Sequence, residues 1–527
     1  MAKKKNENTL QYMQMPLPKG RKYSKMTKVA FGGLNKRQTI DSGELSMAKN
    51  ISTNEYPYLV PSKLKERIKR GYTNPISMFG FDNFLVVVYR VDGAIKIDYI
   101  AYDESNDTHP TYTGTLKASG ATEEDDVQRS IVQFNVYTEG ETGTIVDGTF
   151  KKRLLIFPDK KSMFFDLDDL LNDTGNKPEG DDFALYDMDA NGVVTPPIKY
   201  ATVHLSRVFG VDDNCVYASK FNDYTNWMLD TSGDDVDSGY DESNAWMSQT
   251  QSNTKADGNF TGITNFQGHV VCFKRDFMHE IYNTKNPFRI VDVYAEGAID
   301  NRSIQDVDGK LIFVSDDNVK IYTGSNPRII SHNLNMPKYT YAVSGTDNRN
   351  YYLYCEDLEG EGYIYVYDTF TDMWSEESTI RRVISFAHNK NGMHILYEDG
   401  TIYRYSDFGY YDRSWEFETD LITNKSVDIK HIKKLQMLAE MVVETELKVY
   451  ILYDDETVGD IIVTEGSLDK RLVFKKEKKD SGREKFPIRV KPRKTANYGF
   501  KLHIEGKGYV KLYGLEIFVE QGGEMYV

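Results

Sequence analysis

The sequence contains few cysteines and few prolines, and it contains no long apolar run. The three cysteines among 527 residues, Cys215, Cys272 and Cys355, lie far apart and form no Cys-x-x-Cys pair. A disulfide framework or a zinc finger is therefore not expected, and we predict three inert, partly buried thiols. No apolar stretch reaches the roughly 18–20 residues that span a bilayer. No apolar segment follows the basic residues Lys3–Lys5, so we predict synthesis in a cytoplasm without a secretory signal peptide.

Positive charge is also scarce. The chain has 65 Lys and Arg against 80 Asp and Glu, a net charge of −15, which makes it a poor candidate for gripping DNA through the phosphates. Residues 1–70 carry 16 Lys and Arg and 5 Asp and Glu, a net charge of +11, which leaves −26 on residues 71–527. A basic arm on an acidic body often docks on another copy or another subunit, and a solvated tail is the alternative.

Aromatic residues, in contrast, are abundant. The 37 Tyr and 26 Phe favour half-buried pleated surfaces, which argues against a helical bundle or a disordered chain. Four segments share one pattern, in which a short apolar strand and a turn precede an alternating strand. They begin at Gly268, Gly309, Asn350 and Gly392, which are 41, 41 and 42 residues apart. A period near 40 residues with about four short strands per unit is typical of the blades of a β-propeller.

Three earlier segments repeat the pattern at longer intervals. They begin at Asn83, Lys152 and Arg207, and the intervals that follow are 69, 55 and 61 residues. Each interval contains a polar stretch that we interpret as an inserted loop. These loops are residues 106–126, 172–197 and 230–258. The sequence thus predicts an all-β protein with a propeller of about seven blades at residues 71–415, entered through the arm at residues 1–70; six and eight blades are the alternatives.

The period stops after Trp415. Alternating strands joined by polar loops follow, such as Leu447–Tyr453 and Tyr509–Val519. About 110 residues with this spacing favour an antiparallel β-sandwich. We predict a jelly-roll-like sandwich at residues 416–527 as a second domain, packed on the propeller.

Motifs that carry chemistry are scarce. The nine His show no metal-binding spacing, and the sequence has neither a nucleophile elbow nor a phosphate-binding loop. Asp187–Asn191 matches the first half of a calcium loop, but Ile198 stands where a bidentate Glu is needed, so an Asx-rich turn is the alternative. We therefore predict no catalytic, cofactor-binding or metal-binding residues.

Two stretches resemble a known family. The first is a Gly-Gly-Leu-Asn motif, followed by a Gly-Glu-Leu motif, an Asn and a Pro-x-Leu-x-Pro segment. Its residues here are Gly32, Gly33, Leu34, Asn35, Gly43, Glu44, Leu45, Asn50, Pro57, Leu59 and Pro61. The second lies in the predicted propeller and contains three motifs. In the first, Tyr217–Ser219 precedes Trp227, and in the second, Phe273–Arg275 precedes Met278. The third lies in a later strand, where this chain has Asn318 at a position usually occupied by Gly.

These stretches are similar to the β-propeller proteins of bacteriophage tails, the nozzle, hub and tail-stabilisation proteins. The resemblance implies a structural virion protein that forms an oligomeric ring below the portal and adaptor, made in the host cytoplasm and located in the tail. It implies as partners other copies of the chain, the adaptor and portal-side proteins, and tail fibres or a needle. Genomic DNA would pass through the lumen without tight binding. The resemblance implies no enzymatic activity and no cofactor.

Two other functions are open to a propeller with this composition. A carbohydrate- or receptor-binding propeller could stack sugars on Trp227, Tyr240 and Trp246. A glycoside hydrolase would need a pair of carboxylates, and the sequence identifies no such pair.

Overall fold

The computed structural model covers residues 1–527 and describes a large part of them. The described residues run from 23 to 521. The gaps within this range are residues 29, 38–39, 42, 70, 83, 102–110, 118–129, 140–144, 158–161, 168–184, 190–192, 230–243, 249–257, 284, 287, 295, 337, 380, 407–412, 424–429, 443–444, 454–472, 476–483, 491–495 and 498.

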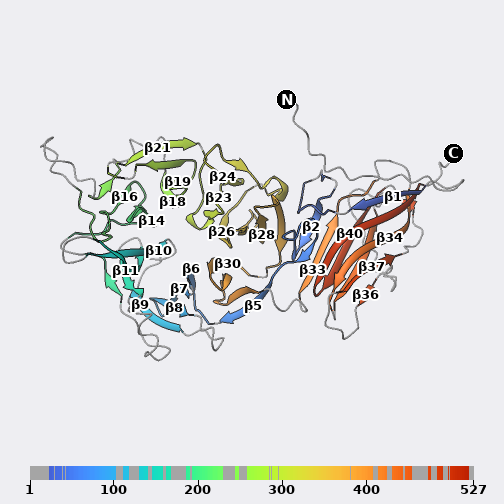
Figure 1. Cartoon of the computed structure of the whole chain (residues 1–527), viewed down its shortest axis with the longest axis horizontal. Coiled ribbons are helices and arrows are strands. Elements are labelled where there is room, and N and C mark those ends of the chain that lie inside the picture. Colours follow the sequence, from blue (N-terminus) through green and yellow to red (C-terminus); the bar gives the residue numbers. More distant parts are fainter. Residues whose placement is uncertain are drawn as a thin grey trace.

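The elements are strands, with two short 3-10 helices, η2 (Asn301–Ser303) and η3 (His332–Leu334). Seven antiparallel units of four strands each follow one another around a ring (Figure 1). The first three units contain β6 (Pro75–Phe81), β7 (Phe84–Val91), β8 (Ala94–Ala101) and β9 (Thr111–Lys117); β10 (Ser130–Glu139), β11 (Ile145–Phe157), β12 (Met163–Asp166) and β13 (Tyr186–Asp187); and β14 (Tyr200–His204), β15 (Arg207–Val211), β16 (Val216–Ala218) and β17 (Trp246–Met247).

The remaining four units have the same order of strands. They contain β18 (Phe260–Phe266), β19 (His269–Lys274), β20 (Met278–Tyr282) and β21 (Arg289–Tyr294); β22 (Gln305–Val307), β23 (Lys310–Val314), β24 (Val319–Tyr322) and β25 (Arg328–Ile329); β26 (Tyr341–Thr346), β27 (Asn350–Glu356), β28 (Gly362–Asp368) and β29 (Met373–Glu377); and β30 (Val383–Asn389), β31 (Gly392–Tyr397), β32 (Ile402–Ser406) and β5 (Leu64–Lys69). The first strands of several neighbouring units contact one another, as β6 and β30 do. This architecture is that of a β-propeller.

The apolar core of the propeller lies between neighbouring units. In β7, Val86 and Val88 pack towards β10–β12, whereas Val87 packs towards β30–β32. The strand is therefore covered on both faces, which explains why it reads as a continuous apolar run instead of an alternating one.

The tyrosines of β27 show why this residue type is so common. Tyr351 and Tyr352 are both buried, and they face opposite sides of the unit. The Tyr351 hydroxyl donates to the Ser303 carbonyl at 2.8 Å, and the Tyr352 hydroxyl donates to Asp347 Oδ2 at 3.0 Å. Each ring fills the space between two units while its hydroxyl group makes a hydrogen bond.

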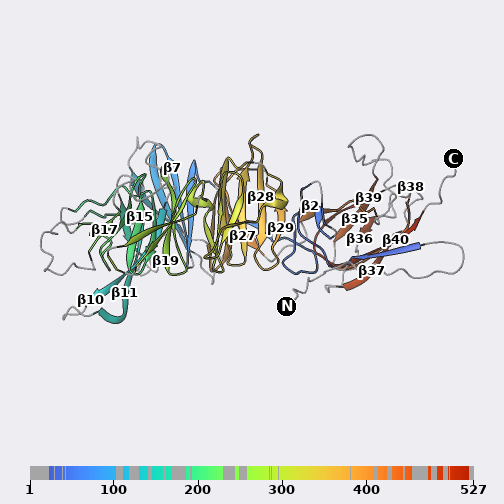
Figure 2. The ribbon, with the colours of Figure 1, turned by 90° about the horizontal axis from the view of Figure 1, so that it is seen from above.

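Strands from both ends of the chain form two further sheets, which lie beside the propeller (Figures 1 and 2). One contains β1 (Tyr23–Lys28), β40 (Val510–Gln521), β34 (Lys430–Met441), β37 (Glu484–Val490) and β38 (Ala496–Asn497). The other contains β2 (Leu45–Lys49), β33 (Ser414–Thr419), β39 (Phe500–Lys507), β35 (Glu446–Tyr453) and β36 (Val473–Lys475). β2 also pairs in parallel with β29, so this sheet continues into the propeller as one sheet of nine strands. A two-stranded ribbon of β3 (Ile51–Ser52) and β4 (Val60–Pro61) follows β2.

The polar stretches interpreted as inserted loops differ from that prediction. Each of them contains the outermost strand of a propeller unit, namely β9 in residues 106–126, β13 in 172–197 and β17 in 230–258. An outer strand has one neighbouring strand and is partly exposed, so its composition is polar and resembles that of a loop. The rest of these stretches lies largely outside the described residues.

The domain limits also differ from those expected. Within residues 1–70, β1 and β2 belong to the C-terminal sheets, and β5 completes the propeller unit of β30–β32. The arm predicted from its positive charge thus contributes β1, β2 and β5 to three larger sheets and also forms the ribbon of β3 and β4. Some of its lysines lie on strand surfaces, as Lys25 does beside Glu516 at 2.7 Å, so the positive charge did not distinguish a strand from a tail.

Two turn glycines test the packing between the last propeller unit and the segment after β5. Gly400 and Gly360 occupy equivalent turns with φ of +73° and +83°. A Cβ at Gly400 would overlap the backbone of Tyr72, whereas a Cβ at Gly360 would meet nothing within 4 Å. We expect G360A to lower the free energy of unfolding by about 1–2 kcal/mol through backbone strain. G400A should lower the free energy of unfolding by about 1–3 kcal/mol more than G360A, because the added methyl group would overlap the backbone of Tyr72.

Thermal denaturation followed by circular dichroism measures both variants. Equal losses of stability in G400A and G360A would contradict the close approach of Gly400 to Tyr72.

Candidate functional site

The residues that carry the first family resemblance lie where the propeller meets the C-terminal sheets. We call residues 30–69 the N-terminal strap. The Leu34 amide donates to the Trp374 carbonyl at 2.7 Å, which holds the strap against β29. A Cβ on Gly33 would lie 2.8 Å from both Met373 Cβ and the Trp374 oxygen. Only glycine therefore permits this close contact between strap and propeller.

Asn35 and Glu44 hold the two halves of this motif together. The Asn35 amide donates to the Leu45 carbonyl at 2.8 Å, and its side-chain Nδ2 donates to Glu44 Oε2 at 2.5 Å. The Asp41 amide also donates to Glu44 Oε2, at 3.0 Å. Asn35 is fully buried, so its two bonds satisfy polar groups that water does not reach.

Asn50 connects the strap with both neighbouring parts. Its Nδ2 donates to Ser378 Oγ, after β29, and to the Ser414 carbonyl at the start of β33, both at 2.9 Å. Its Oδ1 accepts from the Ser378 amide at 2.9 Å and from Arg413 Nη2 at 3.3 Å. Asn50 has a φ of +56°, which asparagine adopts more readily than most residues.

A buried ion-pair network lies next to Asn50. Glu377 Oε2 is 3.0 Å from Lys65 Nζ and accepts from the Tyr405 hydroxyl at 2.9 Å. Arg413 Nη2 is 3.8 Å from Glu377 Oε1 and donates to Ser62 Oγ at 2.5 Å. Burial alone would raise the pKa of Glu377, but Lys65 and Arg413 outweigh it and lower the pKa below its ordinary value.

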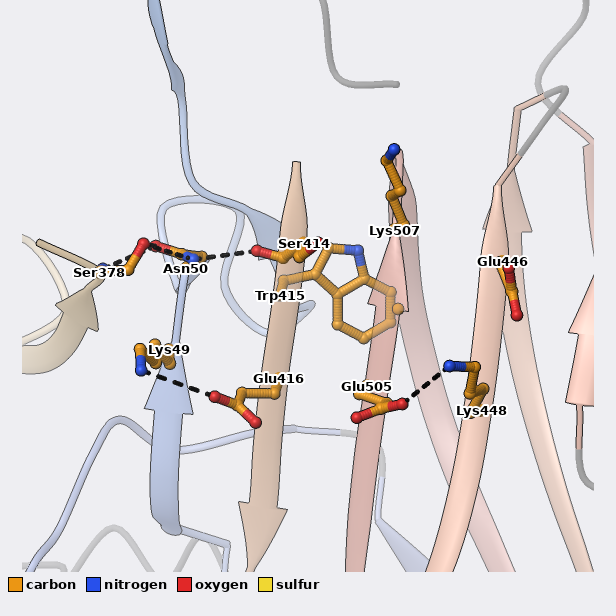
Figure 3. A pocket seen from close by; sticks show the side chains of 11 residues that line it. Lys49, Asn50, Ser378, Ser414, Trp415, Glu416, Glu446, Lys448, Glu505 and Lys507 are labelled. Atoms are coloured by element: carbon orange, nitrogen blue, oxygen red, sulfur yellow. Dashed lines mark hydrogen bonds and ion pairs between the residues drawn. The ribbon is translucent and has the colours of Figure 1, made fainter. Parts of the chain in front are cut away.

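A groove of about 500 Å³ opens at the same junction, along the ends of β2, β33, β39 and β35 (Figure 3). It is lined by Lys49, Asn50, Ser378, Ser414, Trp415, Glu416, Glu446, Lys448, Glu505, Gly506 and Lys507. Lys49 lies 3.8 Å from Glu416, and Lys448 lies 3.1 Å from Glu505 (Figure 3). Because its three lysines alternate with three glutamates, the groove suits a polar protein segment of mixed charge better than a polyanion.

Hydrogen bonds fix the charges along one wall of the groove. Lys448 and the Tyr450 hydroxyl both donate to Glu505 Oε1, at 3.1 Å and 2.8 Å. Burial opposes these two bonds, but together they lower the pKa of Glu505, and the bond to Glu505 raises the pKa of Lys448. Both side chains are therefore charged at neutral pH.

The described residues show little else that could act chemically. All three cysteines are buried and free, as predicted, and burial raises the pKa of each thiol. Among the described residues, no group of three or more His, Cys, Asp or Glu is recognised as able to hold a metal ion. No helix in the described part of the chain has the length and apolar character needed to cross a membrane.

Of the three residues expected to stack on a sugar, the two that the structure describes do not form a binding surface. Trp227 is 6% exposed and belongs to the core between two propeller units. Trp246 is half-buried and packs against Phe288, with ring centroids 5.4 Å apart. Tyr240 lies outside the described residues. The expectation for Trp227 is wrong because its indole fills the gap between the sheets of β10–β13 and β14–β17.

The candidate calcium loop is described only in part. Asp187 lies in β13, and Asp189 Oδ1 accepts from the Thr195 amide at 2.9 Å, as an aspartate does in a turn. Asn191 lies outside the described residues, so both interpretations of Asp187–Asn191 stay open.

Sequence reasoning identified Asn50 through its motif but missed Glu377, Lys65 and Arg413. No local signal marks these three, since each is one charged residue among many and their contacts join distant parts of the chain. Gly506 carries a weak signal: a glycine within an alternating strand indicates a close approach. A Cβ there would overlap the Trp415 ring.

No protein-family model and no curated protein matches the chain. The extracellular domain of a putative hybrid two-component system from B. thetaiotaomicron is 10% identical, with a TM-score of 0.40 over 75% of this chain and 57% of that one. BamB from Moraxella catarrhalis is 9% identical, with a TM-score of 0.34 over 68% and 96%. BBS1N, solved in complex with ARL6DN, is 11% identical, with a TM-score of 0.35 over 66% and 97%. At such TM-scores these likenesses carry no argument about function.

Replacing Glu377 tests the buried network. E377Q leaves Lys65 and Arg413 without their buried counter-charge, so we expect it to lower the free energy of unfolding by about 3–5 kcal/mol. The matched control is E66Q. Glu66 follows Lys65 in β5, but its side chain is exposed and pairs with Arg404. E66Q should cost at most about 1 kcal/mol. Urea denaturation at neutral pH measures both, and similar costs would contradict the network.

The network also predicts a dependence on pH. The pKa of Glu377 is lowered on folding from 4.5, so its stabilisation is fully present above that value and is lost as the pH falls through the folded-state pKa. Between neutral pH and about pH 3, the wild type should lose more stability than E377Q. Urea titrations across this range measure the difference. Parallel losses in the two proteins would show that Glu377 does not titrate differently in the folded and unfolded chains.

Proposed function

We propose that this protein is a structural component of a bacteriophage tail. In this proposal it forms a homo-oligomeric ring, a nozzle or hub below the portal and adaptor, which lines or closes the DNA exit channel and anchors fibres. The observation that carries the proposal is the position of the phage-like motif. Gly33 packs against the propeller, and Asn50 bonds to Ser378 and Ser414 on either side of the junction. Asn35 and Glu44 bond to each other and hold the two halves of the motif together.

The junction supports a mechanical role. A ring that transmits force between a portal and tail fibres needs subunits whose parts do not shift against each other. Here the nine-stranded sheet crosses from the propeller into the C-terminal region through β2, and Glu377 adds a buried ion pair across it. We infer that the two C-terminal sheets form the predicted jelly-roll-like sandwich. Side chains of β34 and β40 share an apolar cluster with those of β33, β35 and β39.

Charge supports a role as a conduit. Residues 1–22 carry 6 Lys and Arg and 1 Glu, which leaves a net charge of −20 on residues 23–527, and this favours the sliding of DNA over its retention. The junction groove, with its alternating lysines and glutamates, is the surface we assign to a neighbouring subunit.

No observation favours a carbohydrate-binding propeller, since Trp227 is buried in the core. That the protein is not an enzyme and needs no cofactor stays a prediction.

Labelling of virions tests the proposed function. An antibody against this protein, bound to purified phage particles, should appear at the tail in negative-stain electron microscopy. Purified full-length protein, alone or with its adaptor, should form closed rings, and these should not retain duplex DNA at physiological salt. A label absent from the tail would overturn the proposal. Specific glycan binding by a monomer that forms no ring would support the alternative instead.

A further inference from the structure

Apolar side chains gather on the surface of the third propeller unit, the sheet of β14–β17. Four of the twelve large apolar side chains that are exposed in the described part of the chain belong to this unit, and their exposed fractions lie between 37% and 63%. They are Leu205, Phe221, Met228 and Leu229, and we call them the apolar corner. Single apolar residues are common on a protein surface, whereas a group of them indicates an interaction site.

Backbone hydrogen bonds fix one half of the apolar corner. The Asn222 amide donates to the Ser206 carbonyl at 2.8 Å, so Phe221 lies beside the turn that contains Leu205. The buried guanidinium group of Arg207 lies 6.0 Å from the centre of the Phe221 ring. The exposed ring and the turn are therefore held in place before any partner binds.

A tryptophan fixes the other half. Trp227 lies in the apolar core between the second and third units, where it is 6% exposed. Met228 follows it directly and is 63% exposed, so these two neighbouring side chains face opposite directions. The Lys220 amide donates to the Asn226 carbonyl at 2.9 Å, which brings this segment back next to Phe221. The side chains of the apolar corner therefore share one part of the surface.

Leu205 occupies a position where leucine is unfavourable. It forms the turn between β14 and β15 with Ser206, and the two residues have positive φ angles of +46° and +55°. Equivalent turns in the fourth and fifth units contain Gln267–Gly268 and Asp308–Gly309. Glycine, asparagine and aspartate are the residues preferred in such turns, and an aliphatic residue there is costly. An exposed leucine at a costly position favours a role for its side chain in binding.

The start of β1 lies at the other end of the molecule. Tyr23, the first residue of β1, pairs with Glu520 near the end of β40. These two strands belong to the C-terminal sheets, whereas β14–β17 lie on the far side of the propeller (Figures 1 and 2). Residues 1–22 therefore connect to the described chain at the end opposite the apolar corner.

Residues 1–22 have a composition that suits an apolar surface on an acidic protein. Residues 8–18 carry no charge, and their apolar side chains are Leu10, Tyr12, Met13, Met15 and Leu17. Basic residues flank this stretch, at Lys3–Lys5 and at Lys19, Arg21 and Lys22. Methionine adapts its shape to an apolar surface, and the net charge of −20 on residues 23–527 attracts the basic flanks. At about 3.3–3.6 Å for each extended residue, the whole segment spans up to about 75 Å.

We propose that residues 8–18 of one copy of the chain bind the apolar corner of the next copy. In a ring, copies related head to tail bring the C-terminal sheets of one subunit next to the propeller of another. The contact joins opposite ends of the molecule, as a closed ring requires. This inference rests on the proposed function, because it names the surfaces through which the proposed ring assembles.

A substitution in the apolar corner tests the contact. M228S should weaken the association of the full-length protein roughly tenfold or more, because it removes an apolar side chain that the neighbouring copy buries. The matched control is L358S, since Leu358 is 64% exposed on the turn between β27 and β28 of another unit. L358S should associate like the wild type. Sedimentation velocity over a range of protein concentrations measures both variants.

L205N separates association from folding. Asparagine tolerates the positive φ of this turn better than leucine does, so L205N should raise the melting temperature or leave it unchanged. The same substitution removes an apolar side chain from the contact, so it should weaken association. Thermal denaturation and sedimentation velocity measure the two effects. Unchanged association in both L205N and M228S would overturn the proposal.

Cysteine cross-linking identifies the segment that binds. The three native cysteines are buried, so they do not compete with new exposed thiols. Y12C protein mixed with M228C protein should form, after oxidation by copper phenanthroline, a disulfide-linked dimer with one chain of each variant. Y12C mixed with L358C should not form one. When Y12C and M228C are combined in one chain, oxidation should link many copies in series. A disulfide confined to single chains would overturn the proposal, because the segment would then bind its own propeller.

The results also separate this inference from the proposed function. Wild-type rings that persist unchanged in M228S and L205N, without the cross-link between chains, would overturn the inference and leave the proposed ring in place. A wild type that stays monomeric at every concentration would overturn both.

Discussion

One buried carboxylate, Glu377, depends on cations from two distant parts of the chain. The arrangement of the propeller and the C-terminal sheets depends in turn on this contact between three segments. Lys65 comes from β5 and Arg413 from the segment before β33, while Glu377 itself ends β29. A carboxylate in this position is tolerable only when both cations are present. The strap must therefore be in place between the two parts before the interior of the junction is complete.

This constraint explains the route of the N-terminal region. β1 and β2 join the C-terminal sheets, and β5 then completes the last propeller unit, so one segment closes the ring and attaches it to its neighbour. The closure leaves β32 without a free edge, which removes a site of unwanted strand pairing. A rigid acidic body of this kind suits the tail component that we propose, and the mixed-charge groove at the junction gives it a surface for a neighbouring subunit.

Much of the fold could be predicted from the sequence, because each propeller unit is local. The hairpins starting at Gly268, Gly309 and Gly392 recur at regular intervals, so the sequence alone predicted the repeat. The outer strands β9, β13 and β17 could not be predicted, because a partly exposed strand has a polar composition like that of a loop. The site was predictable only where a motif marked it, as at Asn50. Lys65 and Arg413 meet Glu377 only through tertiary packing, so no motif or spacing in the sequence predicts these contacts.

The buried ion-pair network at Glu377 implies that the propeller and the C-terminal sheets unfold as one cooperative unit. Differential scanning calorimetry of the full-length protein tests this most directly. A single transition, with a calorimetric enthalpy equal to the van't Hoff enthalpy, is the result expected of one unit. Two separable transitions, with one part of the chain still folded after the other has melted, would contradict it.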